Sequence, residues 1–169
     1  SRYGKSKSIT RKSLISFVES VNFVNAPLIA KNRGINVVTS KSQKDCTFLG
    51  SISVTLTTDL EENTVTGALI AKNMPRIVRI NDYNMSIEAE EHMLIVPHEN
   101  KPSMVAKVAV VIGEHNININ RMQVAQKSNK SDNVSIMIIT TDKDVDDLTM
   151  ETINKIDGIK NAQYIRLNP

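Results

Sequence analysis

Apolar and polar residues between positions 92 and 121 follow the order expected for a strand, a turn, a helix and a second strand. Residues 93–96 are all apolar, residues 98–101 are all polar, and Pro102 follows them. Because proline fixes φ and is tolerated in the first turn of a helix, we expect a helix to begin here. Apolar residues then recur with a period of 3.6, which predicts a helix with one broad apolar face, at Met104, Val105, Val108, Ala109, Val111 and Ile112.

Three polar side chains remain near the junctions of this unit, namely His98, Asn100 and Asn118. Asn118 lies within residues 117–122, which alternate roughly as a strand does. Imidazole and carboxamide groups donate and accept hydrogen bonds without adding net charge, which suits a zwitterion such as an amino acid. The alternative interpretation is that these residues are polar only because turns are polar.

The N-terminal half of the chain has the patterns of two helices followed by strands. A helix that Ser8 or Thr10 can cap is expected first, and a second one over residues 22–32 with Pro27 in its first turn. The polar turn at residues 59–63 predicts a hairpin between two of the strands that follow. These strands are expected in four segments rich in Val, Ile and Thr, at residues 35–39, 47–58, 63–72 and 76–80.

The C-terminal part adds a strand, a helix and a last strand to the unit at residues 92–122. Residues 134–139 form a nearly continuous apolar run, as expected for a central strand. The helix is expected to begin at Asp144 or Asp146, with a final strand near residues 164–167. The complete order is strand, helix, strand, strand, helix, strand, which predicts a ferredoxin-like α+β fold.

The chain of 169 residues with 40% apolar content is long enough for two small domains with cores of their own. The short polar run at residues 88–91 is interpreted as a linker, which predicts domains at residues 1–89 and 90–169. The net charge is only +3, from 21 basic and 18 acidic residues, and the chain has three Tyr, three Phe and no Trp. This composition argues against a nucleic-acid partner.

Several kinds of chemistry have no residues to support them. The single cysteine, Cys46, excludes an internal disulfide and cannot alone hold zinc or an iron–sulfur cluster, which points to the cytoplasm. His92, His98 and His115 lie in contexts too dissimilar for a metal site. A dinucleotide fingerprint, a P-loop and a nucleophile elbow are all missing, so we expect no catalysis by this chain alone. No membrane partner is expected either, because no apolar run is long enough to span a bilayer.

The string HENKP at residues 98–102, followed by a helix and by NINI at residues 116–119, resembles the opening of an ACT domain, a βαββαβ ligand-binding module. The resemblance is closest to the ACT domain at the C-terminal end of D-3-phosphoglycerate dehydrogenases. It implies that His98, Asn100 and Asn118 bind serine across a dimer interface. The family usually has Gly directly after the proline, where this chain has Ser103, and a side chain there would crowd the ligand or perturb the turn.

A second resemblance covers the N-terminal half of the chain. The stretch VNFVNAP at residues 21–27, with RGI at 33–35, is similar to the intervening regulatory domain of the same dehydrogenases. PRIVRINDY at residues 75–83 resembles another part of that domain, where a basic residue helps to form an anion site. The resemblance makes Arg76 and Arg79 a candidate anion site, and the alternative is a solvated strand face. Since the chain begins without Met, we expect this partial α/β intervening domain to lack its first part.

Together the resemblances imply a regulatory and oligomerisation fragment of D-3-phosphoglycerate dehydrogenase, which opens L-serine biosynthesis, with serine as its feedback effector. The implied partners are L-serine or a similar amino acid, a second ACT domain, and the catalytic domains of the same chain. NAD then belongs to the parent enzyme, and no cofactor is expected in this fragment. One alternative, which Ser103 supports, is a dimerisation module without an effector. Another is a regulatory part of an iron–sulfur L-serine dehydratase, although a single cysteine cannot ligate such a cluster.

Overall fold

The computed structural model describes residues 25–40, 48–127 and 133–167, and the chain divides into one unit at residues 1–44 and another at residues 45–169. In the first unit, helix α2 (Ala26–Asn32) has Pro27 in its first turn, as the sequence predicted. The helix predicted at Ser8 or Thr10 lies outside the described residues.

The prediction of a strand at residues 35–39 is wrong. Residues 35–40 form no regular secondary structure and are exposed. A run rich in Val and Ile becomes a strand only where another strand supplies hydrogen bonds to its backbone. None of the described strands pairs with this segment, so its composition alone does not make it a strand.

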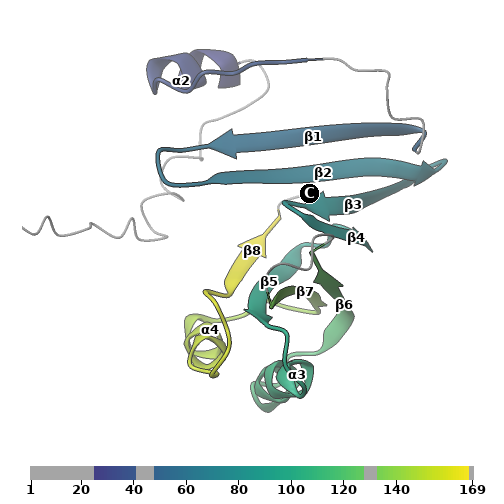
Figure 1. The fold of residues 1–169 in the computed structure, drawn as a ribbon, viewed down its shortest axis with the longest axis vertical. Helices are drawn as coiled ribbons and strands as arrows, with labels where there is room; N and C mark the ends of the chain where they lie inside the picture. The colour runs from purple at the N-terminus through teal and green to yellow at the C-terminus, as the bar shows by residue number, and fades with distance from the viewer. Residues whose placement is uncertain (1–24, 41–47, 128–132, 168–169) are drawn as a thin grey trace, which may run out of the picture. The chain divides into compact units, whose positions relative to one another are not determined.

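The second unit begins with a sheet of four antiparallel strands, arranged in chain order (Figure 1). The predicted hairpin between the first two strands is confirmed, and Thr58 Oγ1 closes its turn by accepting a hydrogen bond from the Glu61 N–H at 3.1 Å. Asn73 and Asn81, with φ of 59° and 49°, lie in the next two turns, in a conformation that asparagine tolerates better than most residues. The strands are β1 (Gly50–Thr57), β2 (Glu62–Ala71), β3 (Met74–Ile80) and β4 (Tyr83–Ile87), the last of which was not predicted.

Period-2 alternation gives this first sheet one apolar and one polar face. In β1 the even-numbered positions carry Gly, Ile, Val and Leu, and the odd-numbered positions carry Ser and Thr. Pairs of hydroxyl groups link β1 to β2 on the polar face, with Oγ–Oγ distances of 2.9 Å for Ser53 and Thr66 and 2.8 Å for Thr55 and Thr64. The polar face is therefore lined with hydrogen-bonding groups.

The rest of the chain forms the predicted ferredoxin-like unit, with an antiparallel sheet in the order β6-β7-β5-β8 (Figure 1). The first helix begins just after Pro102, as predicted. At the start of the second helix Asp146 is the cap, since its Oδ1 accepts a hydrogen bond from the Thr149 N–H at 2.8 Å. The elements are β5 (His92–Glu99), α3 (Met104–Glu114), β6 (Ile119–Gln126), β7 (Val134–Thr141), α4 (Asp147–Asn154) and β8 (Gln163–Arg166).

This second sheet is buried on both faces. On one face its side chains form a core with those of α3 and α4, around Leu94, Met137 and Ile139. On the other face it packs against β3 and β4 of the first sheet in a second cluster that contains Ile80, Tyr83, Met85, Ile87, Met93, Ala125, Ile136 and Ile138. Burial on both sides explains why residues 134–139 form a nearly continuous apolar run instead of alternating.

Candidate functional site

His98 lies near the end of β5, on the face that the helices cover. Its side chain is 2% exposed, and Nδ1 lies 3.1 Å from the carbonyl oxygen of Val96. In a neutral imidazole this contact uses the Nδ1–H, which leaves Nε2 as a hydrogen-bond acceptor. The imidazole has no other hydrogen-bond partner in the described part of the chain, so the acceptor capacity of Nε2 is unused there.

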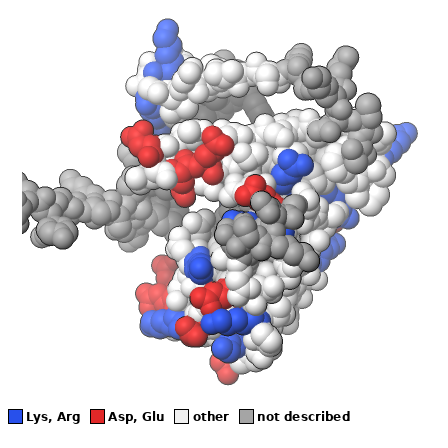
Figure 2. Space-filling view, viewed as in Figure 1, with Lys and Arg blue, Asp and Glu red and all other residues white. Residues whose placement is uncertain are grey.

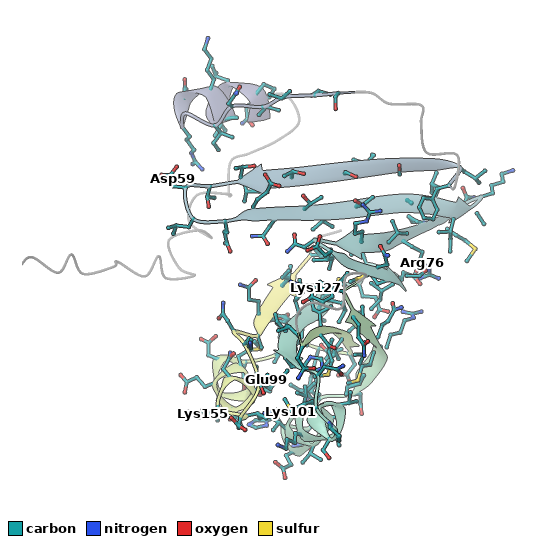
Figure 3. The ribbon with its side chains drawn as sticks, in the orientation of Figure 1. Asp59, Arg76, Glu99, Lys101, Lys127 and Lys155 are labelled. Atoms are coloured by element: carbon teal, nitrogen blue, oxygen red, sulfur yellow. The ribbon has the colours of Figure 1, made fainter. Side chains whose placement is uncertain are left out.

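Asn100 lies in the turn between β5 and α3, where neighbouring residues hold the backbone in place. The Glu99 N–H donates to the carbonyl of Gly158 at 2.8 Å, and the Asn100 N–H donates to the carbonyl of Asn133 at 3.0 Å. A hydrogen bond and the charge of Lys101 hold the pKa of Glu99 below its ordinary value, and Figure 3 shows the two side chains near the start of α3. The Asn100 carboxamide itself is exposed and has no hydrogen bond among the described residues.

Ser103 precedes α3 in the left-handed conformation, with φ of 70°. Its side chain makes no capping hydrogen bond, so the N–H groups of the first helical turn receive no acceptor from it. These N–H groups and the positive end of the helix dipole favour a carboxylate at this point. Because a residue with a β-carbon is strained at positive φ, the structure gives a physical reason why glycine suits this position.

Replacing Ser103 with Gly is expected to raise the free energy of unfolding by about 1 kcal/mol. The left-handed conformation costs an L residue roughly 1–2 kcal/mol, and the larger entropy of glycine in the unfolded chain offsets part of this gain. Urea denaturation followed by circular dichroism measures the change. Ser51→Gly, at an extended position of β1, is the matched control and should be destabilising instead. Equal effects of the two substitutions would contradict the strain at Ser103.

Asn118 immediately precedes β6 and is held by Asp142, which follows β7. The backbone N–H and Nδ2 of Asn118 donate to Asp142 Oδ1 and Oδ2 at 2.9 and 2.8 Å, and the Asp142 N–H donates to the Asn118 carbonyl at 3.1 Å. Because Nδ2 is engaged, the carboxamide Oδ1 is left to accept a hydrogen bond from a ligand. Asp142 was not predicted from the sequence, where its only signal is its place at the end of an apolar run.

The contact between Asn118 and Asp142 is expected to break in acid. Hydrogen bonds from the carboxamide and backbone of Asn118 hold the pKa of Asp142 below its ordinary value. A carboxyl group with a lowered pKa stabilises the folded state above about pH 4, and this contribution is lost as pH falls through the folded-state pKa. The NMR signals of the Asn118 side-chain amide should therefore stay constant from neutral pH to about pH 4 and shift below it.

Asp146 at the cap of α4 also has a lowered pKa, because Thr149 donates hydrogen bonds to it, so global stability cannot report on Asp142 alone. The matched control is Asp142→Asn, in which the Asn118 signals should no longer change with pH. A shift that persists in this variant would show that another group causes it.

His98 and Asn100 lie two residues apart at the end of β5, whereas Asn118 lies at the other end of the second sheet. Strand pairing sets His98 opposite Ser135 of β7, whereas β6 begins opposite Thr141. At about 3.4 Å per residue, these two levels of β7 are roughly 20 Å apart. A ligand of amino-acid size therefore cannot contact both groups within one chain. Asn118 does, however, lie beside β6, which is an edge strand.

Arg76 and Arg79 lie on the same face of the first sheet, because a bulge in β3 interrupts its alternation. Arg76, labelled in Figure 3, lines a cavity of about 640 Å³, and its Nη1 lies 2.8 Å from Glu88 Oε2. Arg79 is exposed, has no ion pair among the described residues, and lines a smaller cavity of about 270 Å³. That smaller cavity is also lined by hydrogen-bonding side chains, those of Ser51, Ser53, Thr66, Asn84 and Ser86.

Within the described ranges, His, Cys, Asp and Glu side chains form no group of three or more that could hold a metal ion. The helices in those ranges are also too short or too polar to cross a membrane. Basic and acidic side chains are interspersed on the face that Figure 2 shows. They are likewise interspersed along the sequence.

Comparison with known proteins agrees with the two resemblances. The family model for the D-3-phosphoglycerate dehydrogenase intervening domain matches residues 7–81, and the model for the ACT domain matches residues 92–158. A D-3-phosphoglycerate dehydrogenase of Methanocaldococcus jannaschii is 34% identical over 92% of this chain and 29% of its own length. One of Synechocystis is 32% identical over 88% of this chain and 26% of its own length. A probable L-serine dehydratase beta chain of Bacillus subtilis is 24% identical over 78% of this chain and 59% of its own length.

The chain thus spans less than a third of the dehydrogenases that it matches. The two domain matches follow each other in the order that the sequence predicted and together cover most of the chain. The chain therefore carries the intervening domain of the D-3-phosphoglycerate dehydrogenase family, followed by an ACT domain.

Proposed function

We propose that this chain is the regulatory part of a D-3-phosphoglycerate dehydrogenase and binds L-serine between the ACT domains of two copies. His98 and Asn100 of one copy form one half of each site, and the partner subunit's Asn118 forms the other half. The observation that carries this proposal is the separation of roughly 20 Å between the two halves within one chain. In a dimer, the second copy supplies the other half of the site.

Antiparallel pairing of two β6 edges brings the halves together. It sets the start of one β6 against the end of the other, so the partner subunit's Asn118 lies level with His98. Three strand spacings of about 4.8 Å then separate β5 from the partner strand, or roughly 14 Å. The two side chains and a three-carbon amino acid can span that distance.

The groups in this arrangement match the polar parts of serine. The N–H groups of the first turn of α3 bind the carboxylate, which the helix dipole favours. His98 Nε2 and Oδ1 of the partner subunit's Asn118 accept hydrogen bonds from the ammonium and hydroxyl groups, and the Asn100 carboxamide can donate or accept. The site therefore recognises a zwitterion without supplying a side chain of net charge.

In the parent enzyme, the NAD-dependent oxidation of 3-phosphoglycerate takes place in domains outside this chain. Serine acts on them by favouring one arrangement of the domains, since an effector shifts an equilibrium only through its differential affinity for the two states. In this proposal residues 1–89 form the intervening domain and residues 90–169 form the ACT domain, and the chain itself performs no catalysis and holds no cofactor.

Isothermal titration of L-serine into the chain tests the proposal, with glycine and 3-phosphoglycerate titrated in parallel and the oligomeric state followed by light scattering. Asn118→Ala is expected to weaken serine binding about 5- to 150-fold. The substitution removes a hydrogen bond to the ligand, and leaving a polar group of the ligand unpaired costs roughly 1–3 kcal/mol of binding free energy. Asn120→Ala is the matched control, because that carboxamide instead donates to Glu90 Oε2 at 3.0 Å. A flat titration on a folded dimer would contradict the effector site.

A dimerisation module without an effector is the second candidate, and the conformation of Ser103 favours it. Its β-carbon, at positive φ, lies at the end of α3 where the carboxylate would bind. Serine binding that appears only in Ser103→Gly would show that this side chain closes the site. A part of an L-serine dehydratase is a weaker candidate, because the dehydrogenase relatives are 34% and 32% identical and the dehydratase relative is 24% identical.

We also propose an anion site at Arg76 and Arg79 of the intervening domain. Arg79 supports this site, because its guanidinium is exposed and makes no ion pair in the described part of the chain. The cavity beside it is lined by side chains that can donate hydrogen bonds to an oxyanion. Phosphate binding that disappears in Arg79→Gln would support this site, and unchanged binding would count against it.

A further inference from the structure

The acidic segment at residues 88–91 lies between arginines from the two sheets. Glu88 Oε2 is 2.8 Å from Arg76 Nη1 of β3 and 3.4 Å from Arg121 Nη2 of β6. Glu90 Oε1 pairs with Arg121 Nη1. These four groups form an ionic chain from the first sheet to the edge strand of the second sheet, in the order Arg76, Glu88, Arg121, Glu90.

A single oxygen atom of Glu88 contacts both arginines, so the two guanidinium groups share its negative charge. Arg76 is the more buried of the two, with 22% of its side chain exposed against 52% for Arg121, and it makes the shorter contact. In this arrangement Glu88 acts as an internal anion on Arg76. Glu88 occupies Nη1 and places a negative charge beside the guanidinium, so an external anion can bind both Nη groups of Arg76 only after Glu88 has moved toward Arg121.

We infer that Glu88 is an intramolecular competitor that lowers the affinity of Arg76 for external anions, and that Arg121 raises this affinity by sharing the Glu88 carboxylate. We call this arrangement the gate. The ligand class is a small phosphate or carboxylate anion that binds a guanidinium. The inference rests on the proposed anion site and does not require serine binding.

The position of Arg121 connects this gate to the dimer edge. Arg121 belongs to β6 and lies three residues after Asn118, on the strand that the proposed dimer pairs. A change in the path of β6 therefore changes the contact between Arg121 and Glu88. In this way the ionic chain links the edge of the ACT domain to an arginine of the intervening domain.

Titration with inorganic phosphate at low ionic strength tests the gate, with the Nε–Hε signal of Arg76 followed by NMR. Glu88→Gln is expected to bind phosphate about five- to tenfold more tightly at Arg76, because the competing carboxylate is gone. Arg121→Gln is expected to bind phosphate about two- to threefold more weakly, because Glu88 then forms an ion pair with Arg76 alone. A purely structural role of the ionic chain would move both variants in the same direction.

Glu91→Gln is the matched control, because Glu91 lies in the same segment but pairs with Arg166 of β8 at 2.8 Å, and its phosphate affinity should equal that of the parent. The gain in Glu88→Gln should vanish when Arg76→Gln is added. Equal phosphate affinity in the parent, Glu88→Gln and Arg121→Gln would overturn the gate and leave the anion site in place. Failure of Glu88→Gln to bind phosphate would overturn both.

Discussion

A mixture of Asn100→Ala and Asn118→Ala chains is expected to recover the serine binding that each variant loses alone. Each substitution removes a hydrogen bond to serine and so costs roughly 1–3 kcal/mol of binding free energy. The two substitutions lie in opposite halves of the proposed site. In a mixed dimer one site carries both changes and the other site carries neither. Random mixing makes about half of the dimers mixed, so about a quarter of all sites should bind serine with the affinity of the parent.

Isothermal titration of the equilibrated mixture measures this stoichiometry. The matched control mixes Asn100→Ala with His98→Gln, two substitutions in the same half of the site, and no intact site can form in any dimer. Recovery in the first mixture and none in the second would establish a site shared between chains. Recovery in neither mixture, with both variants folded and dimeric, would contradict the arrangement derived from the strand register.

The second sheet could be predicted from the sequence because its signals are local. Pro102 marks the start of α3, and the 3.6-residue period at residues 104–112 gives its length to within two residues. Gly158 after α4 has φ of 94°, a conformation that favours glycine, and an added β-carbon would lie 3.3 Å from Met104 Cε, so the end of that side chain would have to shift. Signals of this kind need no knowledge of the rest of the fold.

The first sheet was harder to predict because its strands depend on their partners. In β4, buried Tyr83, Met85 and Ile87 alternate with exposed Asn84 and Ser86, but five residues after a turn are a weak signal. Residues 35–39 show the opposite error, since their composition suggests a strand and no described strand pairs with them. Composition identifies residues that suit a strand, whereas pairing decides whether one forms.

The candidate site could be located only in part, because its geometry depends on contacts distant in sequence. His98, Asn100 and Asn118 were proposed from their place in the motif, but strand register is what separates Asn118 from the other two. Asp142, which orients Asn118, is 24 residues away along the chain. The left-handed conformation of Ser103 likewise follows from the path between β5 and α3 and not from its own side chain.

Replacing Ile138 with Ala is expected to lower the free energy of unfolding by about 2–5 kcal/mol, the largest stability effect predicted for this chain. Ile138 is 1% exposed and lies on the face of β7 that turns away from the helices. It packs in one cluster with Tyr83, Met85 and Ile87 of β4, so its truncation leaves a cavity between the two sheets. Urea denaturation followed by circular dichroism measures the loss.

Ile165→Ala is the matched control, because Ile165 lies on the edge strand β8 with 36% of its surface exposed and should cost about 1 kcal/mol or less. Fluorinated tyrosine reports on the sheets separately, since Tyr83 belongs to the first sheet and Tyr164 to the second. If the sheets share one core, the Tyr83 and Tyr164 signals of the parent chain change at the same urea concentration, and the midpoints of these two signals fall together in Ile138→Ala. A midpoint that falls for Tyr83 alone would mean that the sheets unfold independently. The ionic chain from Arg76 to Glu90 would not prevent this, because exposed ion pairs are too weak to hold two sheets in a fixed arrangement.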